Sequence, residues 1–363
     1  MYAAIAHGRI VVERCVMSSP RSRTDEEGWN AQVWSFAERP SALKGRSSDM
    51  QSEHLLDAEL RDVLSKLPVP KEGRTLAEIR SSYLPGRDWG DLGVSMETIT
   101  VAGPTGAPDI RLRIYRPGES NATLPWIYYI HGGGYITGDV ERYESRHRKL
   151  VSDLDCALVA VTYRLSPENV FPAAIDDCYA GLSGAIERAT QLGLHVERYG
   201  VMGDSAGGGL AAGLSLMARD RKEHALQFQH LIYPMLDDRT CVSDDPHPYV
   251  GEYVFNAASN HFCWMSMLGE APGGSAVSPY AAPSRAIDLT GLPSTYIASG
   301  ALDLFLEEDI EYGRRLTRAG VPLELHIYPG ACHGFDLFET ELGETARLAS
   351  IAALRRSLGR VAN

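Results

Sequence analysis

Two hydrophobic patterns alternate along most of the chain. Short apolar runs, typical of strands buried on both faces of a sheet, occur at 126–130, 157–163, 200–203, 228–233, 295–299 and 323–328. Apolar positions three and four residues apart, or an Ala-rich stretch, predict helices at 175–189, 210–217, 302–310 and 348–352. This alternation predicts an α/β fold in which helices cover both faces of a mostly parallel sheet.

Two segments before the first of these runs are also expected to be strands. Residues 96–101 and 109–115 are rich in strand-forming residues, and in the second segment Ile110, Leu112 and Ile114 alternate with Arg111 and Arg113. Because they are close in sequence, we expect the two strands to pair antiparallel at an edge of the sheet.

The remaining segments suggest how the chain is divided. Residues 1–50 differ from the rest and predict an N-terminal extension of uncertain order. Within 51–90, leucines and a valine at helical spacing predict one amphipathic helix, which Pro68 and Pro70 end. The strand–helix alternation occupies 91–363, interrupted at about 237–283 by an aromatic-rich insertion without a strand–helix period. Insertions of this length are usually functional, so we expect this one, with the helix in residues 51–90, to form a cap over one end of the sheet.

Composition and charge exclude several classes of protein. The 363 residues are 44% hydrophobic and 23% charged, which is ordinary globular usage and not that of a fibrous or disordered protein. The formal charge of 35 − 47 = −12 disfavours nucleic acid and anionic membranes as partners. No run approaches the roughly 20 apolar residues of a membrane span. Six scattered cysteines without a CxxC pair suggest a reducing compartment, so we predict a cytoplasmic protein.

Two glycine-rich motifs point to nucleophilic catalysis. The GDSAG sequence at 203–207 matches GxSxG directly between a predicted strand and a predicted helix, where the sharp turn would expose the hydroxyl of Ser205. The HGGG sequence at 131–134 follows another predicted strand. Glycine backbone there would let N–H groups form an oxyanion hole together with the N–H of Ala206.

A nucleophilic serine needs a base and an acid, which in this kind of fold follow in the order Ser, Asp or Glu, His. His333 is the candidate base, because only His326 and His333 follow the acid candidate Asp303 and His326 falls within a predicted strand. Asp303 comes just after a predicted strand and is preferred as the acid. The rival carboxylates belong to the following helix and are Glu307, Glu308 and Asp309.

The combined motifs resemble those of the hormone-sensitive-lipase-like carboxylesterases, a family of α/β-hydrolases, over roughly 80–358. The matching sequences are HGGGY at 131–135, YRLSPE at 163–168, FPAA at 171–174, GDSAGG at 203–208, YPG at 328–330 and HGF at 333–335. The resemblance implies an α/β-hydrolase catalytic domain with a helical cap. It also implies a Ser205, His333 and Asp303 triad and an oxyanion hole formed by Gly133, Gly134 and Ala206, with Gly132 as a third glycine.

Four positions depart from the family pattern. The family usually has Asp-Pro-Leu at the acid, where this chain has Asp303-Leu304-Phe305, and Ala and His where it has Ser166 and Asn169. The expected activity is hydrolysis of small-molecule esters. Because an aromatic-rich cap predicts a small apolar pocket, we expect short acyl chains of about two to six carbons.

Other activities remain open on the sequence alone. The same triad would serve an acyltransferase, a lactonase or an amidase, and members of this family also act as non-catalytic ligand receptors, typically after losing the catalytic histidine. No HExxH motif, spaced His/Cys cluster, GxGxxG or P-loop is present, so we predict neither a metal nor a nucleotide cofactor. A homodimer is possible.

Overall fold

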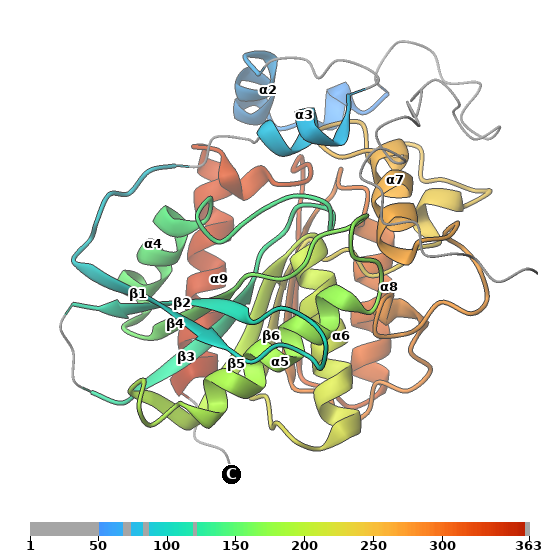
Figure 1. Cartoon of the computed structure of the whole chain (residues 1–363). Helices are drawn as coiled ribbons and strands as arrows, with labels where there is room; N and C mark the ends of the chain where they lie inside the picture. Colours follow the sequence, from blue (N-terminus) through green and yellow to red (C-terminus); the bar gives the residue numbers. More distant parts are fainter. Residues whose placement is uncertain (1–50, 68–73, 83–86, 119–121, 360–363) are drawn as a thin grey trace, which may run out of the picture.

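The computed structural model describes residues 51–67, 74–82, 87–118 and 122–359, and the predicted extension at 1–50 lies outside these ranges. Its centre is an eight-stranded sheet with the order β1-β2-β4-β3-β5-β6-β7-β8 (Figure 1). The strands are β1 (Val94–Val101), β2 (Ile110–Pro117), β3 (Leu124–Ile130), β4 (Ala157–Val161), β5 (Leu194–Asp204), β6 (Phe228–Ile232), β7 (Ser294–Gly300) and β8 (Leu323–Tyr328).

Strand directions follow the sequence-based expectation. β1 pairs antiparallel with β2, and β2 pairs antiparallel with β4, whereas every later pairing is parallel. This confirms the mostly parallel sheet and its antiparallel edge. β5 begins six residues before the apolar run at 200–203. The run did not reveal this first half of the strand, because it is largely solvent-accessible and includes the polar residues Glu197 and Arg198.

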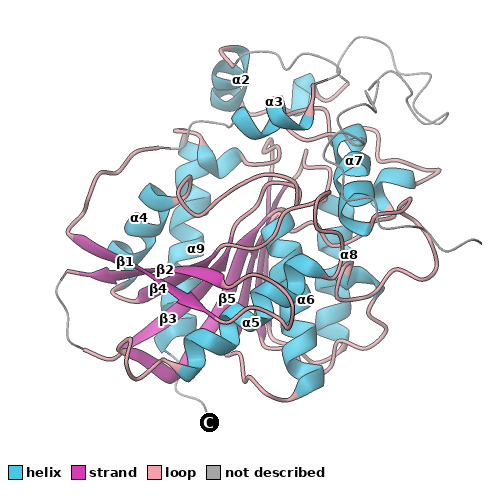
Figure 2. Cartoon of the chain, in the orientation of Figure 1, coloured by secondary structure: helices cyan, strands magenta, loops and turns pink. Residues whose placement is uncertain are grey.

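Helices cover both faces of the sheet (Figure 2). In β3, Trp126, Tyr128 and Ile130 point into the larger core cluster, whereas Ile127 and Tyr129 point into the second. This alternation shows why a strand buried on both faces is apolar throughout. Helices α5 (Ala173–Glu187), α6 (Ala206–Arg221) and α8 (Leu306–Arg318) contribute to the first cluster, and α4 (Glu144–Leu154) and α9 (Glu341–Gly359) to the second.

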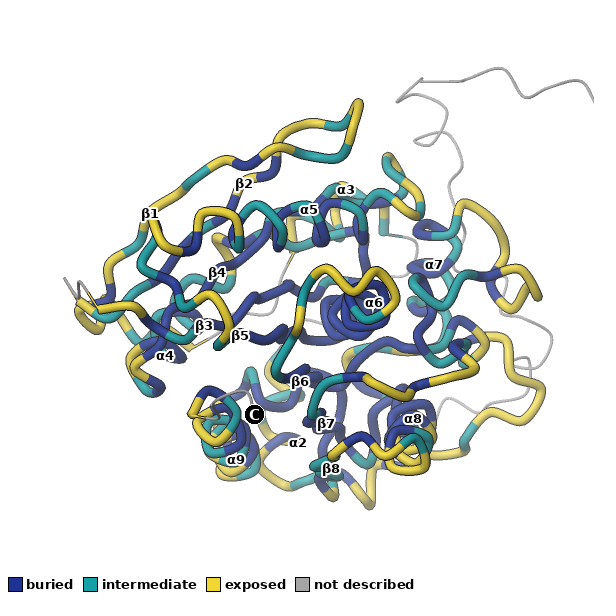
Figure 3. The backbone as a smooth tube through the Cα atoms, turned by 90° about the horizontal axis from the view of Figure 1, so that it is seen from below, coloured by how far each residue is buried: buried dark blue, intermediate teal, exposed yellow. Residues whose placement is uncertain are grey.

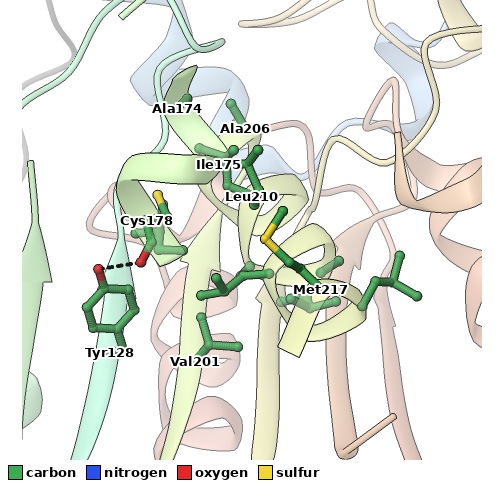
Figure 4. Close-up of a cluster of buried hydrophobic side chains, with 14 of the residues drawn as sticks. Tyr128, Ala174, Ile175, Cys178, Val201, Ala206, Leu210 and Met217 are labelled. Carbon is green, nitrogen blue, oxygen red and sulfur yellow. Dashed lines mark hydrogen bonds between the residues drawn. The ribbon is translucent and has the colours of Figure 1, made fainter. Parts of the chain in front are cut away.

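Helix α6 is the most deeply buried of these helices, with every residue from 206 to 218 buried (Figure 3). Its Leu210 and Met217 belong to the same core cluster as Val201 of β5 and Ile175 of α5 (Figure 4). Such a helix cannot shift without opening cavities in the core. The turn at its N-terminus is therefore held rigidly against the sheet.

Two predicted helices are confirmed, but not all of the apolar positions that predicted them lie on a buried side. Helix α8 begins at Leu306, so Leu302 precedes it, and Ile310 is 42% exposed. In α9, Leu348 is 58% exposed, and the buried side of the helix includes Ala346, Ser350, Ala353 and Leu354. The apolar spacing was only a partial guide, because small and polar residues such as Asp309, Gly313 and Ser350 share the buried sides of these helices with apolar ones.

Two other sequence expectations need correction. The described residues of 51–90 hold two α-helices instead of one, α2 (Ala58–Ser65) and α3 (Leu76–Ser81), together with the short 3₁₀ helix η2 (Glu53–Leu55). Pro68 and Pro70, which we expected to end the helix, lie outside the described residues. The insertion at 237–283 contains helix α7 (Ala257–Leu268), although we expected no helical period there. Cys263, Trp264 and Met267 are buried along this helix, so a short period was present and missed. Three more 3₁₀ helices are η3 (Thr240–Val242), η4 (Pro283–Arg285) and η5 (Phe335–Leu337).

Figure 1 shows α2, α3 and α7 beyond one end of the sheet, at the top of the view. Local sequence signals begin two of these helices: Thr75 and Glu78 form a capping box at α3, and the Asn256 side chain accepts a hydrogen bond from the Ser259 N–H at α7. Among the described helices, none is long and apolar enough to cross a membrane.

Candidate active site

Ser205 occupies a strained turn between β5 and α6. Its φ of 55° and ψ of −123° are rare for a residue with a side chain, and its N–H donates to the Ile232 carbonyl at 2.9 Å. A Cβ on Gly207 would collide with the Ile130 carbonyl, so the first turn of α6 reaches this close to β3 only with glycine. The turn presents the serine hydroxyl at the carboxyl ends of the parallel strands.

The structure brings Ser205, His333 and Asp303 together although they are far apart in sequence. His333 lies in the loop after β8, and its Nε2 is 3.0 Å from Ser205 Oγ. Its Nδ1 is 2.8 Å from Oδ2 of Asp303, which follows β7. Asp303 is fully buried, and its Oδ1 accepts a hydrogen bond from the Phe305 N–H at 3.0 Å. The geometry matches that of a nucleophile, a base and an orienting acid.

The rival residues make other contacts. Glu308 is buried and accepts hydrogen bonds from the backbone N–H groups of Leu236 and Asp237. Glu307 is exposed, and Asp309 is fully buried on α8, where burial raises the pKa of its carboxyl. His326 lies in β8, with its Nε2 2.8 Å from Glu324 Oε1.

Aromatic rings surround the imidazole of His333. Tyr233 packs edge-on at 4.7 Å between ring centroids, and Phe255 and Phe305 each lie at 5.3 Å. Phe255 comes from the insertion at 237–283, whereas the other two rings follow strands of the sheet. The rings restrict water around the base and limit its rotation, which favours a fixed proton-transfer geometry.

The glycines after β3 lie beside the nucleophile. A Cβ on Gly132 would be 3.4 Å from Ser205 Cβ, and one on Gly134 would collide with Cys263 Sγ of α7. Gly133 has a φ of 119°, and its Cβ would collide with the Thr137 carbonyl. Only glycines fit this loop, which places their backbone next to Ser205 and the N-terminus of α6, where Ala206 is the first helical residue.

The imidazole ring of His131 contacts this glycine loop. Its ring stacks on Tyr163 at 4.3 Å, and its Nδ1 lies 2.8 Å from the Gly132 carbonyl oxygen. Burial lowers the pKa of His131 to about 4, so the ring is neutral at pH 7 and its Nδ1–H donates to that carbonyl. The sequence motif identified the loop but not this role of its histidine.

A cavity of about 1480 Å³ opens onto Ser205 and His333. Ile79 of α3 and Phe262 of α7 line it, together with charged side chains that include Arg142, Arg239 and Glu307. We expected a small apolar pocket, and that expectation is wrong. Aromatic residues of the insertion do reach the cavity, but charged residues from several segments also line it, so its wall is mixed.

Sequence reasoning also missed a buried charged network beside these residues. Arg146 of α4 forms ion pairs with Asp204 and Asp336, which lie close in sequence to Ser205 and His333 respectively. The partners of Arg146 are about 60 and 190 residues away along the chain, so no local pattern reveals them. Among the described residues, no group of three or more His, Cys, Asp or Glu side chains could hold a metal ion.

Comparison with known proteins agrees with this geometry. A family model described as alpha/beta hydrolase fold matches residues 127–337, more than half of the chain. The esterase LipI of Mycobacterium tuberculosis is 35% identical over 243 residues, which cover 65% of this chain and 73% of LipI. The carboxylesterase NlhH of the same species is 31% identical over 314 residues, which cover 84% of this chain and 96% of NlhH.

The fold of this chain is also similar to that of a solved esterase structure. A bacterial heroin esterase superposes with a TM-score of 0.79 at 37% identity, covering 85% of this chain and 99% of that protein. The similarity therefore extends well beyond the motifs around Ser205. The names of all three proteins describe hydrolysis of esters.

Proposed function

Since the chain belongs to the α/β-hydrolase family of hormone-sensitive-lipase-like carboxylesterases, we propose that it hydrolyses carboxylic esters through an acyl-enzyme on Ser205. One observation carries the assignment of residues: a continuous chain of hydrogen-bond contacts runs from Ser205 Oγ through the His333 imidazole to the Asp303 carboxylate. The contacts of 3.0 and 2.8 Å are within reach for proton transfer in the resting protein.

In the first step, Ser205 Oγ attacks the carbonyl carbon of the ester while His333 Nε2 takes the hydroxyl proton. Asp303 accepts a hydrogen bond from Nδ1–H and stabilises the imidazolium that forms. The tetrahedral intermediate then collapses, the bond to the alcohol oxygen breaks, and His333 gives its proton to that oxygen. The products are the free alcohol and an ester of Ser205.

The developing oxyanion needs fixed donors. We assign this role to the backbone N–H groups of Gly133, Gly134 and Ala206, with Gly132 as a third glycine of the same loop. The proximity of this loop to Ser205 supports the assignment, as does the position of Ala206 at a helix N-terminus, where N–H groups lack partners within the helix. Each such donor typically contributes about 3 kcal/mol to transition-state stability.

In the second step, a water molecule replaces the alcohol. His333 takes a proton from the water, whose oxygen attacks the acyl carbon, and the protonated imidazole returns a proton to Ser205 Oγ as the acyl bond breaks. The carboxylic acid leaves, and the resting enzyme is restored. An alcohol in place of water would make the same triad an acyltransferase.

The cavity suggests which part of the substrate is large. Phe255 lines the cavity and packs beside the imidazole of His333, so it takes up space next to the base, which supports short acyl chains of about two to six carbons. The volume of about 1480 Å³ exceeds what such an acyl group needs. We therefore propose a short-chain ester of a bulky alcohol, with polar groups of the alcohol facing the charged part of the wall.

A nitrophenyl ester series of increasing acyl length, measured beside an amide and a lactone, tests this function. We expect the highest kcat/KM at short chains and little turnover of the amide. Ser205→Ala should lower kcat by about 10⁴-fold or more, whereas Ser215→Ala on the same helix should leave it unchanged. Full hydrolysis by the Ser205 variant would show that another residue is the nucleophile, and a maximum at long chains would refute the substrate proposal.

A cytoplasmic location and a homodimer remain predictions. The five cysteines that the structure describes are all buried and unpaired, which suits a reducing compartment. Sedimentation velocity of the full chain would give its oligomeric state, and a monomer at all concentrations would refute the dimer.

A further inference from the structure

Arg146 connects the two loops that carry Ser205 and His333. It projects from α4, and its side chain is only 15% exposed. One terminal nitrogen lies 3.0 Å from Asp204 Oδ2, and the other lies 3.0 Å from Asp336 Oδ2. The two terminal nitrogens of a guanidinium lie in one fixed plane, so they can hold two carboxylates at a set distance from each other.

The first carboxylate is attached to the nucleophile turn. Asp204 immediately precedes Ser205, and its Oδ2 also accepts a hydrogen bond from the Tyr129 hydroxyl of β3. Burial raises the pKa of the Asp204 carboxyl, and the Arg146 guanidinium opposes that rise. The contact with Arg146 therefore helps to keep this carboxylate charged and in place.

The second carboxylate is attached to the histidine loop. Asp336 follows His333 by three residues, and its Oδ1 accepts a hydrogen bond from the Tyr233 hydroxyl at 2.6 Å. The Tyr233 ring in turn packs edge-on against the imidazole of His333. Arg146 is thus linked to the base through Asp336 and Tyr233, and to the nucleophile through the residue before it.

We propose that Arg146 is a positioning residue for ester hydrolysis, which fixes the distance between Ser205 and His333 and sets the charge beside the imidazole. The inference rests on the proposed function, because it assumes that Ser205 and His333 carry out the reaction. Arg146 lines the same cavity as Ser205, but the proposal requires no contact between Arg146 and substrate.

The charge effect depends on all ionisable groups near His333. They come from seven parts of the fold: Asp303 after β7, Ser205 and Asp204 at the β5–α6 turn, Tyr233 after β6, Arg146 of α4, Cys332 and Asp336 of its own loop, Asp309 of α8 near Asp303, and Arg347 of α9, which donates to the Asp336 carbonyl. Arg347 pairs with Glu344, whereas Arg146 is the cation in this set that pairs with the Asp204 and Asp336 carboxylates. Removing its charge leaves more negative charge near the imidazole, which favours the protonated form of His333.

The pH dependence of kcat/KM separates this role from a purely structural one. The fall of kcat/KM at low pH, its acid limb, reports protonation of the catalytic imidazole in the free enzyme. In Arg146→Met we expect the limb to move to higher pH by about one unit. We also expect kcat to fall by about ten- to a hundredfold, because a small misplacement of reacting groups slows catalysis strongly. KM for a short nitrophenyl ester should change less than kcat.

Two further variants separate charge from geometry. Arg146→Lys keeps the charge but cannot hold both carboxylates in one plane, so its acid limb should stay near that of the wild type while kcat remains reduced. The double variant Arg146→Met/Asp336→Asn removes the bridge and restores the net charge, and it should behave like Arg146→Lys. Should Arg146→Met fail to fold, the double variant alone carries the test, because it leaves fewer uncompensated buried charges.

Arg148→Met is the matched control, two residues further along α4. Arg148 pairs with Glu144 and Asp91 and has no contact with Asp204 or Asp336 in the described residues. We expect wild-type kcat and pH profile from it. Wild-type kcat in a folded Arg146→Met or in the double variant would overturn the proposal, and so would an acid limb that fails to move in Arg146→Met. In either case, an inactive Ser205→Ala would leave the proposed function intact. Full activity in Ser205→Ala would refute both the role of Arg146 and the proposed function.

Discussion

Buried neutral histidines make the stability of this protein sensitive to acid. His230 of β6 is 1% exposed, its ring stacks on Tyr296 at 4.1 Å between centroids, and its Nε2 is 2.7 Å from Ser350 Oγ. Burial lowers its pKa from 6.5 to about 3. In the unfolded chain the same side chain has an ordinary pKa, so between these two values the unfolded state binds a proton that the folded state does not.

The size of the effect follows from these pKa values. The folded-state pKa is depressed, so the stability is complete above pH 6.5 and is lost as pH falls below it. At pH 5, 6.5 − 5 = 1.5 units at 1.36 kcal/mol each give a loss of about 2 kcal/mol from His230. His131, with a pKa of about 4, gives about the same loss. Together these are a large part of a typical free energy of unfolding of about 5–15 kcal/mol.

Urea unfolding of the wild type and His230→Gln at pH 7.5 and pH 5.0 measures the contribution of this one residue. At pH 7.5 the variant should be less stable by about 1 kcal/mol, because the stacked ring is lost. At pH 5.0 the variant should be more stable than the wild type by about 1 kcal/mol, because glutamine does not titrate. Other titrating groups are common to both proteins and cancel in the difference.

The control is His54→Gln, because His54 is exposed in the short helix η2. This variant should keep the pH dependence of the wild type. If the stability difference between His230→Gln and the wild type were the same at both pH values, His230 would not be held neutral by burial, and the reasoning would be refuted.

Three further substitutions test other parts of the site. Gly133→Ala should lower kcat by about 10²-fold, because its Cβ would collide with the Thr137 carbonyl, whereas a Cβ on Gly274 meets open space and Gly274→Ala should be neutral. Asp309→Asn should raise the free energy of unfolding by about 2 kcal/mol at pH 8, because burial raises the pKa of Asp309 and makes its charged form costly. Chemical denaturation should show this gain disappearing below about pH 4, where the carboxyl is protonated in the folded and the unfolded state. Phe255→Ala should shift the best nitrophenyl ester to longer acyl chains, and an unchanged optimum would place the acyl group elsewhere.

Sequence reasoning succeeded where a short segment determines its own structure. The run at 126–130 is buried on both faces of the sheet, and the glycines around Ser205 allow a turn that few other residues permit, so local patterns sufficed. The order of strands and catalytic candidates then followed from general rules for parallel sheets. The proximity of Ser205, His333 and Asp303 was therefore expected before their distances were known.

Where tertiary contacts decide the outcome, sequence reasoning failed. Helix α4 was not predicted, since its buried His147, Leu150, Val151 and Leu154 are mixed with five charged residues. The apolar spacing in α8 and α9 only partly matches their buried sides, because small and polar residues such as Gly313 and Ser350 are buried there as well. The mixed wall of the cavity and the pairing of Arg146 with Asp336 depend on segments that meet only in the folded chain. No period or motif encodes such contacts.

The central claim is that Ser205 forms the acyl-enzyme. Treatment of the full chain with a fluorophosphonate, followed by peptide mass spectrometry, identifies the reactive serine directly. We predict a single label on Ser205, with labelling greatly slowed in His333→Ala, because the imidazole no longer accepts the hydroxyl proton. A label on another residue, or equally fast labelling of Ser205 without His333, would contradict the proposed mechanism.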